Sequence, residues 1–304
     1  MTSSPRAAVE GSRRRGTSPW SLRLPGDRRI VRGSLPPLMA LVNLTPASFS
    51  DGDRFTGAEP AVAPRRDKLR DGADILDLGA ASSRPGGGVY GGGADEVSVD
   101  EEWHRLGPVL EGLRDLTDAP ISVDTRKAEV ARRALDAGAD LVNDVSCLGD
   151  PDMAPLVAQR DVPVVLMHSR GELRTMQRGI SFRDVVSEVT AELAAAVEGA
   201  SEAGIARDQI VVDPGLGFGK TYEQNLTLLA QLPRLGELGL PILVGASRKS
   251  FLGKLGGDPA PQRLIPSLAA AAWSAAKGAD IVRVHDAAET CALLRVWNAI
   301  AGAE

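Results

Sequence analysis

Short runs of apolar residues alternate with longer segments of helical periodicity along most of this chain. Eight short runs are largely apolar rather than alternating, which is typical of strands that are buried on both faces of a parallel sheet. They span residues 38–42, 75–78, 121–123, 141–142, 164–167, 210–212, 242–244 and 281–284. Five intervening segments carry apolar residues at spacings of three and four, which predicts amphipathic helices over residues 100–116, 127–137, 182–203, 264–277 and 288–299.

The order of these segments predicts the fold class. The tripeptide Gly-Ala-Asp occurs at 72–74, 138–140 and 278–280, just before three of the strands, where Gly can cap the preceding helix and Asp can start the turn. Eight β/α units in one series predict an α/β fold of the closed (β/α)8 TIM barrel type, because an open doubly wound sheet usually has fewer strands. We expect one barrel domain over residues 35–304, preceded by a largely disordered N-terminal extension over residues 1–34.

Composition narrows the class of protein. A formal net charge of -5 and an aromatic content of 4% disfavour a nucleic-acid-binding surface, which needs a basic groove with stacking rings. The two cysteines, Cys147 and Cys291, are far apart, so neither a disulfide framework nor a thiolate zinc site is supported. No apolar run approaches the roughly 18 residues of a membrane span, and the Arg- and Ser-rich residues 1–16 lack the apolar core of a secretory signal. We expect a soluble cytoplasmic protein.

The segment 214–221, Pro-Gly-Leu-Gly-Phe-Gly-Lys-Thr, resembles a phosphate-binding loop but does not satisfy its pattern. Pro214 occupies the place of the first required glycine. The dinucleotide fingerprint fails as well, because Lys220 follows where its third glycine is required.

Polar residues end most of the apolar runs, and in a barrel these positions face the active site. The positions are Asn43, Asp124, Asn143, His168, Asp213, the segment 247–250, Arg283 and His285. Any single member is explained equally well as a helix cap or turn residue. Together, carboxylates, amides and cations suit a polar and partly anionic substrate.

Two long segments rich in small residues, 43–52 and 81–88, follow the first two strands. Loops of this composition can close over a ligand, although ordinary turns have the same composition.

Seven motifs occur in the same order as in a known family of enzymes. They are Val-Asn-Leu-Thr-Pro with Ser-Phe-Ser-Asp-Gly (42–52), Ser-Arg-Pro-Gly (83–86), Ile-Ser-Val-Asp-Thr (121–125), Asn-Asp-Val (143–145), Asp-Pro-Gly-Leu-Gly-Phe-Gly-Lys (213–220), Ser-Arg-Lys-Ser-Phe (247–251) and Arg-Val-His-Asp (283–286). From about residue 35 onward, the chain resembles the dihydropteroate synthases. That resemblance implies Mg2+-assisted condensation of 6-hydroxymethyl-7,8-dihydropterin pyrophosphate with para-aminobenzoate in folate biosynthesis, inhibition by sulfonamides, and a homodimer formed through the late helices.

The resemblance also implies roles for individual residues. Pterin would be bound by Asp124, Asn143, Asp213 and Lys249, between walls formed by Met167, Phe218 and Gly245. Pyrophosphate would be bound by Arg84, Arg283 and His285, with Mg2+ on Asn43. Para-aminobenzoate would be bound by Thr45, Pro46, Phe49, Ser83, Arg248 and Ser250. Catalysis would rest on Lys249, Arg283 and His285, with Asp51 stabilising the cation or orienting the first loop.

The chain departs from the family pattern in both loops. Ala47 replaces a usual Asp, Asp53 replaces a usual Gly, and Ala80-Ala81 stands where Gly-Glu is expected. Two alternatives therefore stay open: a pterin-binding homologue without synthase activity, and a barrel of the methyltetrahydrofolate methyltransferase type. The second alternative needs no pyrophosphate site, so the cations of segments 247–249 and 283–285 argue against it.

Overall fold

Eight parallel strands form the centre of the molecule. The computed structural model describes residues 20–45, 58–81, 97–172, 175–256 and 263–303. Its strands are β3 (Leu38–Asn43), β4 (Ile75–Gly79), β5 (Ile121–Asp124), β6 (Leu141–Asp144), β7 (Val164–Met167), β8 (Ile210–Asp213), β9 (Leu243–Val244) and β10 (Ile281–Val284). They pair in parallel in the order β8-β7-β6-β5-β4-β3-β10-β9. A bridge between Val212 and Ile242 joins the two outer strands, so the sheet closes and the predicted (β/α)8 barrel is confirmed.

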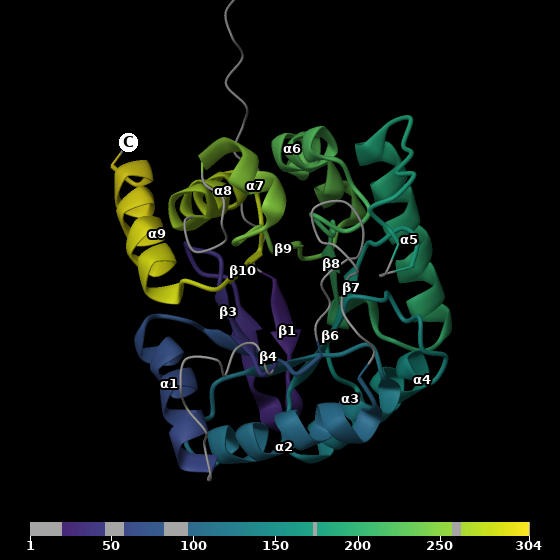
Figure 1. The fold of residues 1–304 in the computed structure, drawn as a ribbon, viewed down its shortest axis with the longest axis vertical. Helices are drawn as coiled ribbons and strands as arrows, with labels where there is room; N and C mark the ends of the chain where they lie inside the picture. The colour runs from purple at the N-terminus through teal and green to yellow at the C-terminus, as the bar shows by residue number, and fades with distance from the viewer. Residues whose placement is uncertain (1–19, 46–57, 82–96, 173–174, 257–262, 304) are drawn as a thin grey trace, which may run out of the picture.

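Helices surround these strands (Figure 1). They are α1 (Ala58–Arg70), α2 (Val99–Arg114), α3 (Ala128–Asp136), α4 (Met153–Arg160), α5 (Val185–Glu202), α6 (Tyr222–Ala230), α7 (Ser250–Gly256), α8 (Leu264–Ala276) and α9 (Ala287–Ala301). The five predicted helices are all present, whereas α1, α4, α6 and α7 were missed. Two prolines, Pro60 and Pro64, mask α1 in the sequence, and the other three are short. Within the described residues, no helix combines the length and apolar content needed to cross a bilayer.

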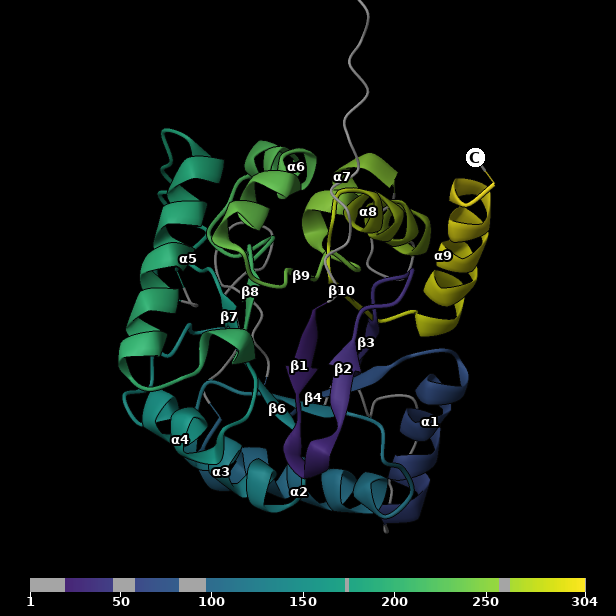
Figure 2. The same ribbon diagram turned by 180° about the vertical axis from the view of Figure 1, so that it is seen from behind.

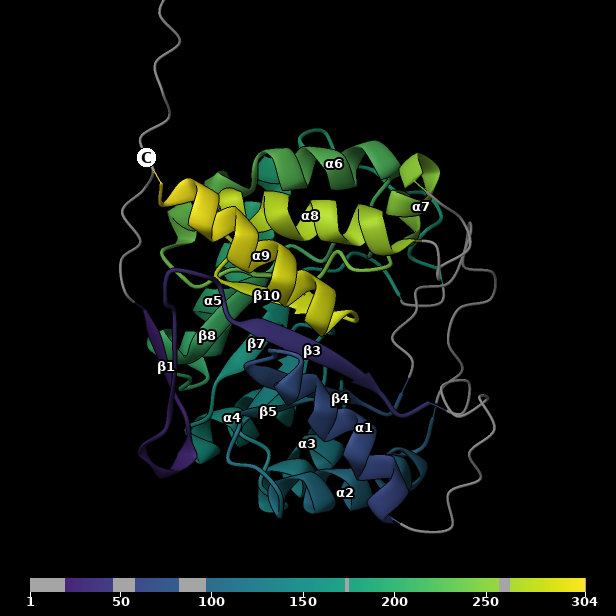
Figure 3. The same cartoon turned by 90° about the vertical axis from the view of Figure 1, so that its left-hand side faces the viewer.

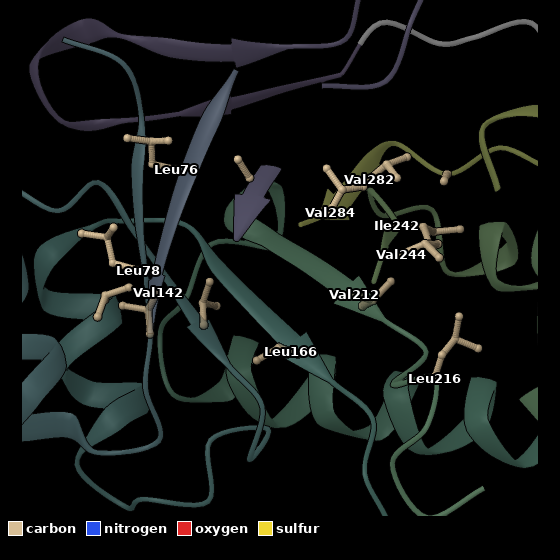
Figure 4. Packing of buried hydrophobic residues seen from close by; sticks show 14 of the residues in the cluster. Leu76, Leu78, Val142, Leu166, Val212, Leu216, Ile242, Val244, Val282 and Val284 are labelled. Atoms are coloured by element: carbon tan, nitrogen blue, oxygen red, sulfur yellow. The ribbon is translucent and has the colours of Figure 1, made fainter. Parts of the chain in front are cut away.

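Successive side chains of each strand point to opposite faces, which divides the core into two parts. One set, including Leu76, Val142 and Val212, points outward and packs under the helices (Figure 4). The other set points into the barrel and forms a separate apolar layer toward the amino ends of the strands. The inward set consists of Met39, Ile75, Leu141, Val165, Val211, Leu243 and Ile281.

The three Gly-Ala-Asp segments end helices and fix strands. Gly72, Gly138 and Gly278 have φ between 95° and 98°, a left-handed conformation that favours glycine. Each aspartate side chain then accepts a hydrogen bond from a backbone N–H of the neighbouring strand. The donor is the first residue of that strand or the residue just before the strand begins. The pairs are Asp74 with Leu38 (2.8 Å), Asp140 with Ile121 (2.8 Å) and Asp280 with Ile242 (2.9 Å). The aspartates therefore fix pairs of adjacent strands rather than only starting a turn.

A two-stranded hairpin, β1 (Ser21–Arg23) and β2 (Arg29–Val31), covers the amino end of the barrel. In Figure 3, the β3 arrow points away from β1, so β1 lies at the amino end of the strands. Figure 2 shows β1 and β2 side by side across this end of the barrel. The side chains of Leu22, Leu24 and Ile30 are buried in the inward apolar layer. This finding departs from the expected disorder of residues 1–34, because three apolar residues in a short polar segment gave too weak a pattern to predict a hairpin. Residues 1–19 lie outside the described part of the chain.

Two of the Gly-Ala-Asp aspartates also hold the hairpin in place. Trp20 Nε1 donates to Asp280 Oδ1 at 2.8 Å, and Arg32 forms an ion pair with the same carboxylate. Arg28 forms an ion pair with the buried Asp140. The hairpin thus closes the barrel at one end and leaves the carboxyl ends of the strands as the location for a site.

We predict that Leu22→Ala lowers the free energy of unfolding by about 2–5 kcal/mol, because it opens a cavity in the layer that the hairpin seals. Leu116→Ala is the matched control, since Leu116 is 53% exposed and Leu22 is 0% exposed. Urea unfolding followed by circular dichroism measures both. Equal midpoints for the two variants would show that the hairpin does not contribute to the core.

Candidate functional site

The inward apolar layer gives way to polar side chains two residues further along β4, β6, β8 and β10. Asp77 follows Ile75, Asn143 follows Leu141, and Asp213 follows Val211. Because side chains two apart share a face of a strand, these groups also point into the barrel, nearer its carboxyl end. Strand pairing sets Asp124 beside Asn143 and Met167 beside Asp213.

Arg283 lies at the centre of this polar layer. Its Nε donates to Asp77 Oδ2 at 2.6 Å, and its Nη2 donates to Asp124 Oδ2 at 2.6 Å. Asn143 Nδ2 donates to the same Asp77 oxygen at 3.2 Å. Burial acts to lower the pKa of Arg283, but the two carboxylates outweigh it, so the pKa rises and the guanidinium stays charged.

The carboxylates Asp124 and Asp213 are both buried, with different partners. Burial raises the pKa of Asp124 to about 7, opposed by Arg283 and supported by the charge of Asp77. Burial also raises the pKa of Asp213, opposed by Lys249 and by the Gly215 N–H, which donates to Asp213 Oδ1 at 2.7 Å. Buried carboxyl groups of this kind can hydrogen-bond polar ring atoms of a ligand without competition from bulk water.

Lys249 joins the polar layer to an apolar one. Its Nζ donates to the Leu216 carbonyl and lies 4.7 Å from the centre of the Phe218 ring. Burial lowers the pKa of Lys249 to about 8, with Asp213 acting in the opposite direction. Phe218 itself packs with Val145, Met167 and Met176, so a flat apolar wall adjoins the charged groups.

His285 is neutral rather than cationic. Burial, together with Arg248 and Arg283, lowers the pKa of His285 to about 3. Its backbone N–H donates to Ser247 Oγ at 3.2 Å, and its Nδ1 lies 3.0 Å from the same hydroxyl. The Ser247 hydroxyl therefore contacts both the backbone and the ring of His285.

Gly245 and Arg248 both follow β9 in the chain. Arg248 has φ of 56°, a strained conformation for a residue with a side chain, and its guanidinium is paired with Asp286 through Nε at 3.0 Å and through Nη2. A Cβ on Gly245 would lie 3.8 Å from Arg283 Cβ and 3.9 Å from its Cδ, so Gly245 lies beside the aliphatic part of that side chain.

The remaining predicted site residues divide into two groups. Asn43 ends β3 and is exposed, Thr45 follows it, and Ser250 begins α7. Five others lie outside the described residues, namely Pro46, Phe49, Asp51, Ser83 and Arg84.

Some of the positions at which the chain departs from the family pattern are described by the structure and others are not. Ala47 and Asp53 lie outside the described residues, while Ala80 is buried and its carbonyl accepts from Arg105 Nη1 at 3.1 Å. An arginine from α2 thus binds the backbone at the start of the second loop.

The fit to Mg2+ rests on the chemistry of the donors. Among the described residues, no three His, Cys, Asp or Glu side chains are grouped so that they could hold a metal ion. The exposed Asn43 does offer a hard amide oxygen at the carboxyl end of β3. Mg2+ commonly uses one or two protein ligands and completes its coordination shell with substrate phosphates and water. Asn43 therefore fits as the protein ligand of an ion that binds together with a phosphorylated substrate.

His168, another residue expected at the rim, faces away from this site. Met167 points inward, so its neighbour His168 points outward, where Nε2 lies 3.0 Å from Glu192 Oε2 and Nδ1 lies 2.9 Å from Lys220 Nζ. Lys220 Nζ also contacts the carbonyls of Gly215 at 3.0 Å and Phe218 at 2.9 Å. Protein atoms therefore surround the ammonium of Lys220, whereas the lysine of a phosphate-binding loop reaches the phosphates of a bound nucleotide.

Sequence reasoning missed Asp77. Asp77 occupies the same penultimate position in the run 75–78 as Arg283 does in 281–284, but Arg283 belongs to the motif 283–286 and Asp77 belongs to none of the seven motifs. Its Oδ1 has no hydrogen-bond partner among the described residues although the side chain is fully buried. A charged residue in the middle of a buried run was the available signal, because such a charge is stable there only with a partner.

Known proteins match this chain over most of its length. The family described as "Pterin binding enzyme" matches residues 39–285. A dihydropteroate synthase of Synechocystis sp. is 44% identical over 265 residues, which cover 86% of this chain and 89% of the relative. The structure of Xanthomonas albilineans dihydropteroate synthase with 4-aminobenzoic acid is 43% identical, has a TM-score of 0.85, and aligns over 93% of this chain and 98% of that one. The Yersinia pestis dihydropteroate synthase with a sulfonamide drug is 37% identical, with a TM-score of 0.84 over 93% and 99% of the two chains.

We predict that His285 stays neutral from pH 7 down to about pH 4, because its depressed pKa keeps it unprotonated where an unfolded histidine, with a pKa near 6.5, gains a proton. This difference removes stability progressively as the pH falls below 6.5. Two-dimensional 15N NMR of labelled imidazoles measures the titration, and His285→Gln assigns the signal. A midpoint near pH 6.5 would contradict the buried, neutral state.

Proposed function

The chain belongs to the dihydropteroate synthases of the pterin-binding enzyme family, and we propose that the charged cluster around Arg283 is the place where it joins 6-hydroxymethyl-7,8-dihydropterin pyrophosphate to para-aminobenzoate. The observation that carries this assignment is the convergence of Asp77, Asp124, Asn143, Asp213 and Lys249 on one end of the barrel. The family resemblance supplies the substrates, and the geometry supplies groups that suit them.

In this proposal the pterin ring lies among the carboxyl ends of β5, β6 and β8. Asp124 and Asp213 accept hydrogen bonds from ring N–H groups. The side-chain amide of Asn143 can accept a hydrogen bond through its oxygen and donate one through its nitrogen. Met167 and Phe218 cover the face of the ring, since both belong to the apolar wall next to Lys249. Lys249 donates to the ring from the same side.

The pyrophosphate is bound by groups at the ends of β3 and β10. His285 donates from a ring N–H, and Arg283 adds positive charge, although its Nε and Nη2 already bind carboxylates. Arg84 is the proposed third group. Asn43 would hold the Mg2+ that offsets part of the pyrophosphate charge when the substrate is bound.

The reaction is a substitution at the pterin methylene carbon. The bond from this carbon to the pyrophosphate oxygen breaks as the donors stabilise the departing anion, and the electron pair leaves with that oxygen. The carbon becomes strongly cationic before the amine of para-aminobenzoate attacks, and the new C–N bond forms as the amine loses a proton. Buried carboxylates favour this cation electrostatically, and Asp51 is proposed to add to that effect.

Para-aminobenzoate, or a sulfonamide in its place, is proposed to lie between the first two loops and the start of α7. Thr45, Pro46, Phe49, Ser83, Arg248 and Ser250 are the proposed contacts. The pairing of Arg248 with Asp286 holds its guanidinium at the end of β9 and β10, which supports a fixed rather than mobile role.

We also infer the assembly and the compartment. α8 and α9 expose Ile265, Trp273, Val296 and Ile300, which supports a homodimer formed through these late helices. Cys147 and Cys291 are free thiols, which supports a reducing cytoplasmic setting. One barrel domain, closed by the hairpin and covering residues 35–304, is the proposed organisation.

The function is tested by release of pyrophosphate from the pterin substrate. We predict release that depends on both para-aminobenzoate and Mg2+, and a loss of more than tenfold in rate for Lys249→Met, because that variant removes a cation from a water-poor site. Lys254→Met is the matched control, since Lys254 is exposed on α7 five residues later, and it should keep the wild-type rate. Pterin binding without any release of pyrophosphate would favour the homologue without synthase activity.

We further predict ordered binding. Pyrophosphate with Mg2+ should raise the affinity for a sulfonamide in the presence of a pterin, because the two loops have little reason to close while the anion site is empty. Calorimetric titration with and without EDTA measures this coupling. Tight sulfonamide binding to the free enzyme, unaffected by pyrophosphate or by EDTA, would show that the substitutions at Ala47 and Ala81 have changed the mechanism.

A further inference from the structure

Lys220 is a buried lysine to which neither the substrates nor the mechanism assigns a role. Only 3% of the residue is exposed, and its Nζ is surrounded by protein acceptors. They are the carbonyl oxygens of Phe218 at 2.9 Å, Gly215 at 3.0 Å and His168 at 3.3 Å, and His168 Nδ1 at 2.9 Å. Two come from the segment after β8 and two from the residue after β7, so the ammonium joins the ends of two neighbouring strands.

The backbone confirms that these two segments are in direct contact. A Cβ on Gly215 would lie 1.8 Å from the His168 carbonyl oxygen, and a Cβ on Gly219 would lie 2.6 Å from that of Arg170. Both glycines also have positive φ, at 65° and 63°. No other residue type fits at either position without moving backbone, so the close approach that Lys220 bridges is built into the sequence.

The same segment supplies the surroundings of Lys249. The Leu216 carbonyl accepts from Lys249 Nζ, and the Phe218 ring lies under that ammonium. Leu216 lies between Gly215 and Phe218, the two residues of this segment whose carbonyls accept hydrogen bonds from Lys220. Any movement of this segment away from β7 therefore moves the partners of Lys249.

We propose that Lys220 is a positioning residue for catalysis, which fixes the segment 215–219 on the end of β7 and thereby holds Lys249 in place against the Leu216 carbonyl and the Phe218 ring. This inference rests on the proposed function, because it assigns Lys249 to the reaction. It differs from a merely structural role, which would contribute to stability without setting the properties of Lys249.

Several charges act on Lys220. Asp213 and Glu192 favour its charged form, while burial, Lys249 and Arg170 disfavour it, and the pKa of Lys220 falls to about 7. On the outer side, His168 bonds to Glu192, which is paired with Arg170. These contacts orient His168 so that Nδ1 accepts from Lys220 and Nε2–H donates to Glu192.

The test is the pH dependence of kcat/KM for the pterin substrate in Lys220→Met and Lys220→Gln. Wild-type activity should fall at high pH as Lys249, whose pKa is about 8, loses its proton. Lys220→Met removes both the bridge between the two segments and a positive charge that acts on Lys249, so this basic limb should move upward by about one pH unit while kcat/KM falls at least tenfold. Lys220→Gln keeps two N–H donors for the carbonyls and should show the same changes at a smaller size.

Arg114→Met is the control for a structural loss of the same kind. Arg114 also donates to two backbone carbonyls, those of Thr117 and Ala119, and it pairs with the buried Asp140, but at the amino end of the barrel. It should lower the thermal midpoint without moving the basic limb.

A wild-type pH profile in Lys220→Gln, or in a folded Lys220→Met, would overturn the positioning role even if the thermal midpoint falls. Activity of the wild-type enzyme in the same assay separates this outcome from a failure of the proposed function.

Discussion

The pairing of one guanidinium with two carboxylates inside the barrel is the interaction on which the site depends. Arg283, Asp77 and Asp124 come from β10, β4 and β5, and each would be strongly destabilising if it were buried alone. Removing one partner leaves an uncompensated charge, so the three residues constrain one another. Their geometry follows from strand pairing, because the register that aligns the apolar layer also aligns the residues two positions further along.

The two ends of the barrel therefore perform different tasks. At the amino end, apolar side chains and the hairpin exclude water, and aspartates of the Gly-Ala-Asp segments fix adjacent strands to one another. At the carboxyl end, charged and polar side chains that are paired with one another line the proposed site. Because burial holds these groups in fixed orientations before any ligand arrives, little reorganisation is needed as charge develops in the transition state.

Much of this arrangement could be predicted from the sequence, for physical reasons. The eight largely apolar runs revealed the strands because most residues buried on either face are apolar, and the polar residue that ends a run revealed Asp124, Asn143 and Asp213. Asp77 was missed because it lies inside a run and belongs to none of the seven motifs, whereas Arg283, which also lies inside a run, belongs to the motif 283–286. The hairpin was missed because its stability comes from Trp20 and Arg28 meeting aspartates that are more than 100 residues away in sequence, which no local pattern records.

The protonation state of His285 was out of reach for a related reason. A histidine can be a cation or a neutral donor, and the pKa of His285 depends first on burial and then on Arg248 and Arg283, so the fold has to be known. The outward orientation of His168 likewise depends on the alternation of β7. Sequence patterns identify which residues end the strands, whereas three-dimensional packing decides what those residues can do.

If the buried polar groups at the carboxyl ends of the strands bind the pterin ring, the affinity for a pterin should depend on Asp213. Calorimetric titration of a pterin into wild-type protein, Asp213→Asn and the exposed control Asp208→Asn measures this dependence. Replacing a charged acceptor by a neutral amide should weaken binding by about 1.5–3 kcal/mol in Asp213→Asn and leave Asp208→Asn unchanged. Equal pterin affinity in all three proteins, with the fold of each intact, would contradict the assignment of the site.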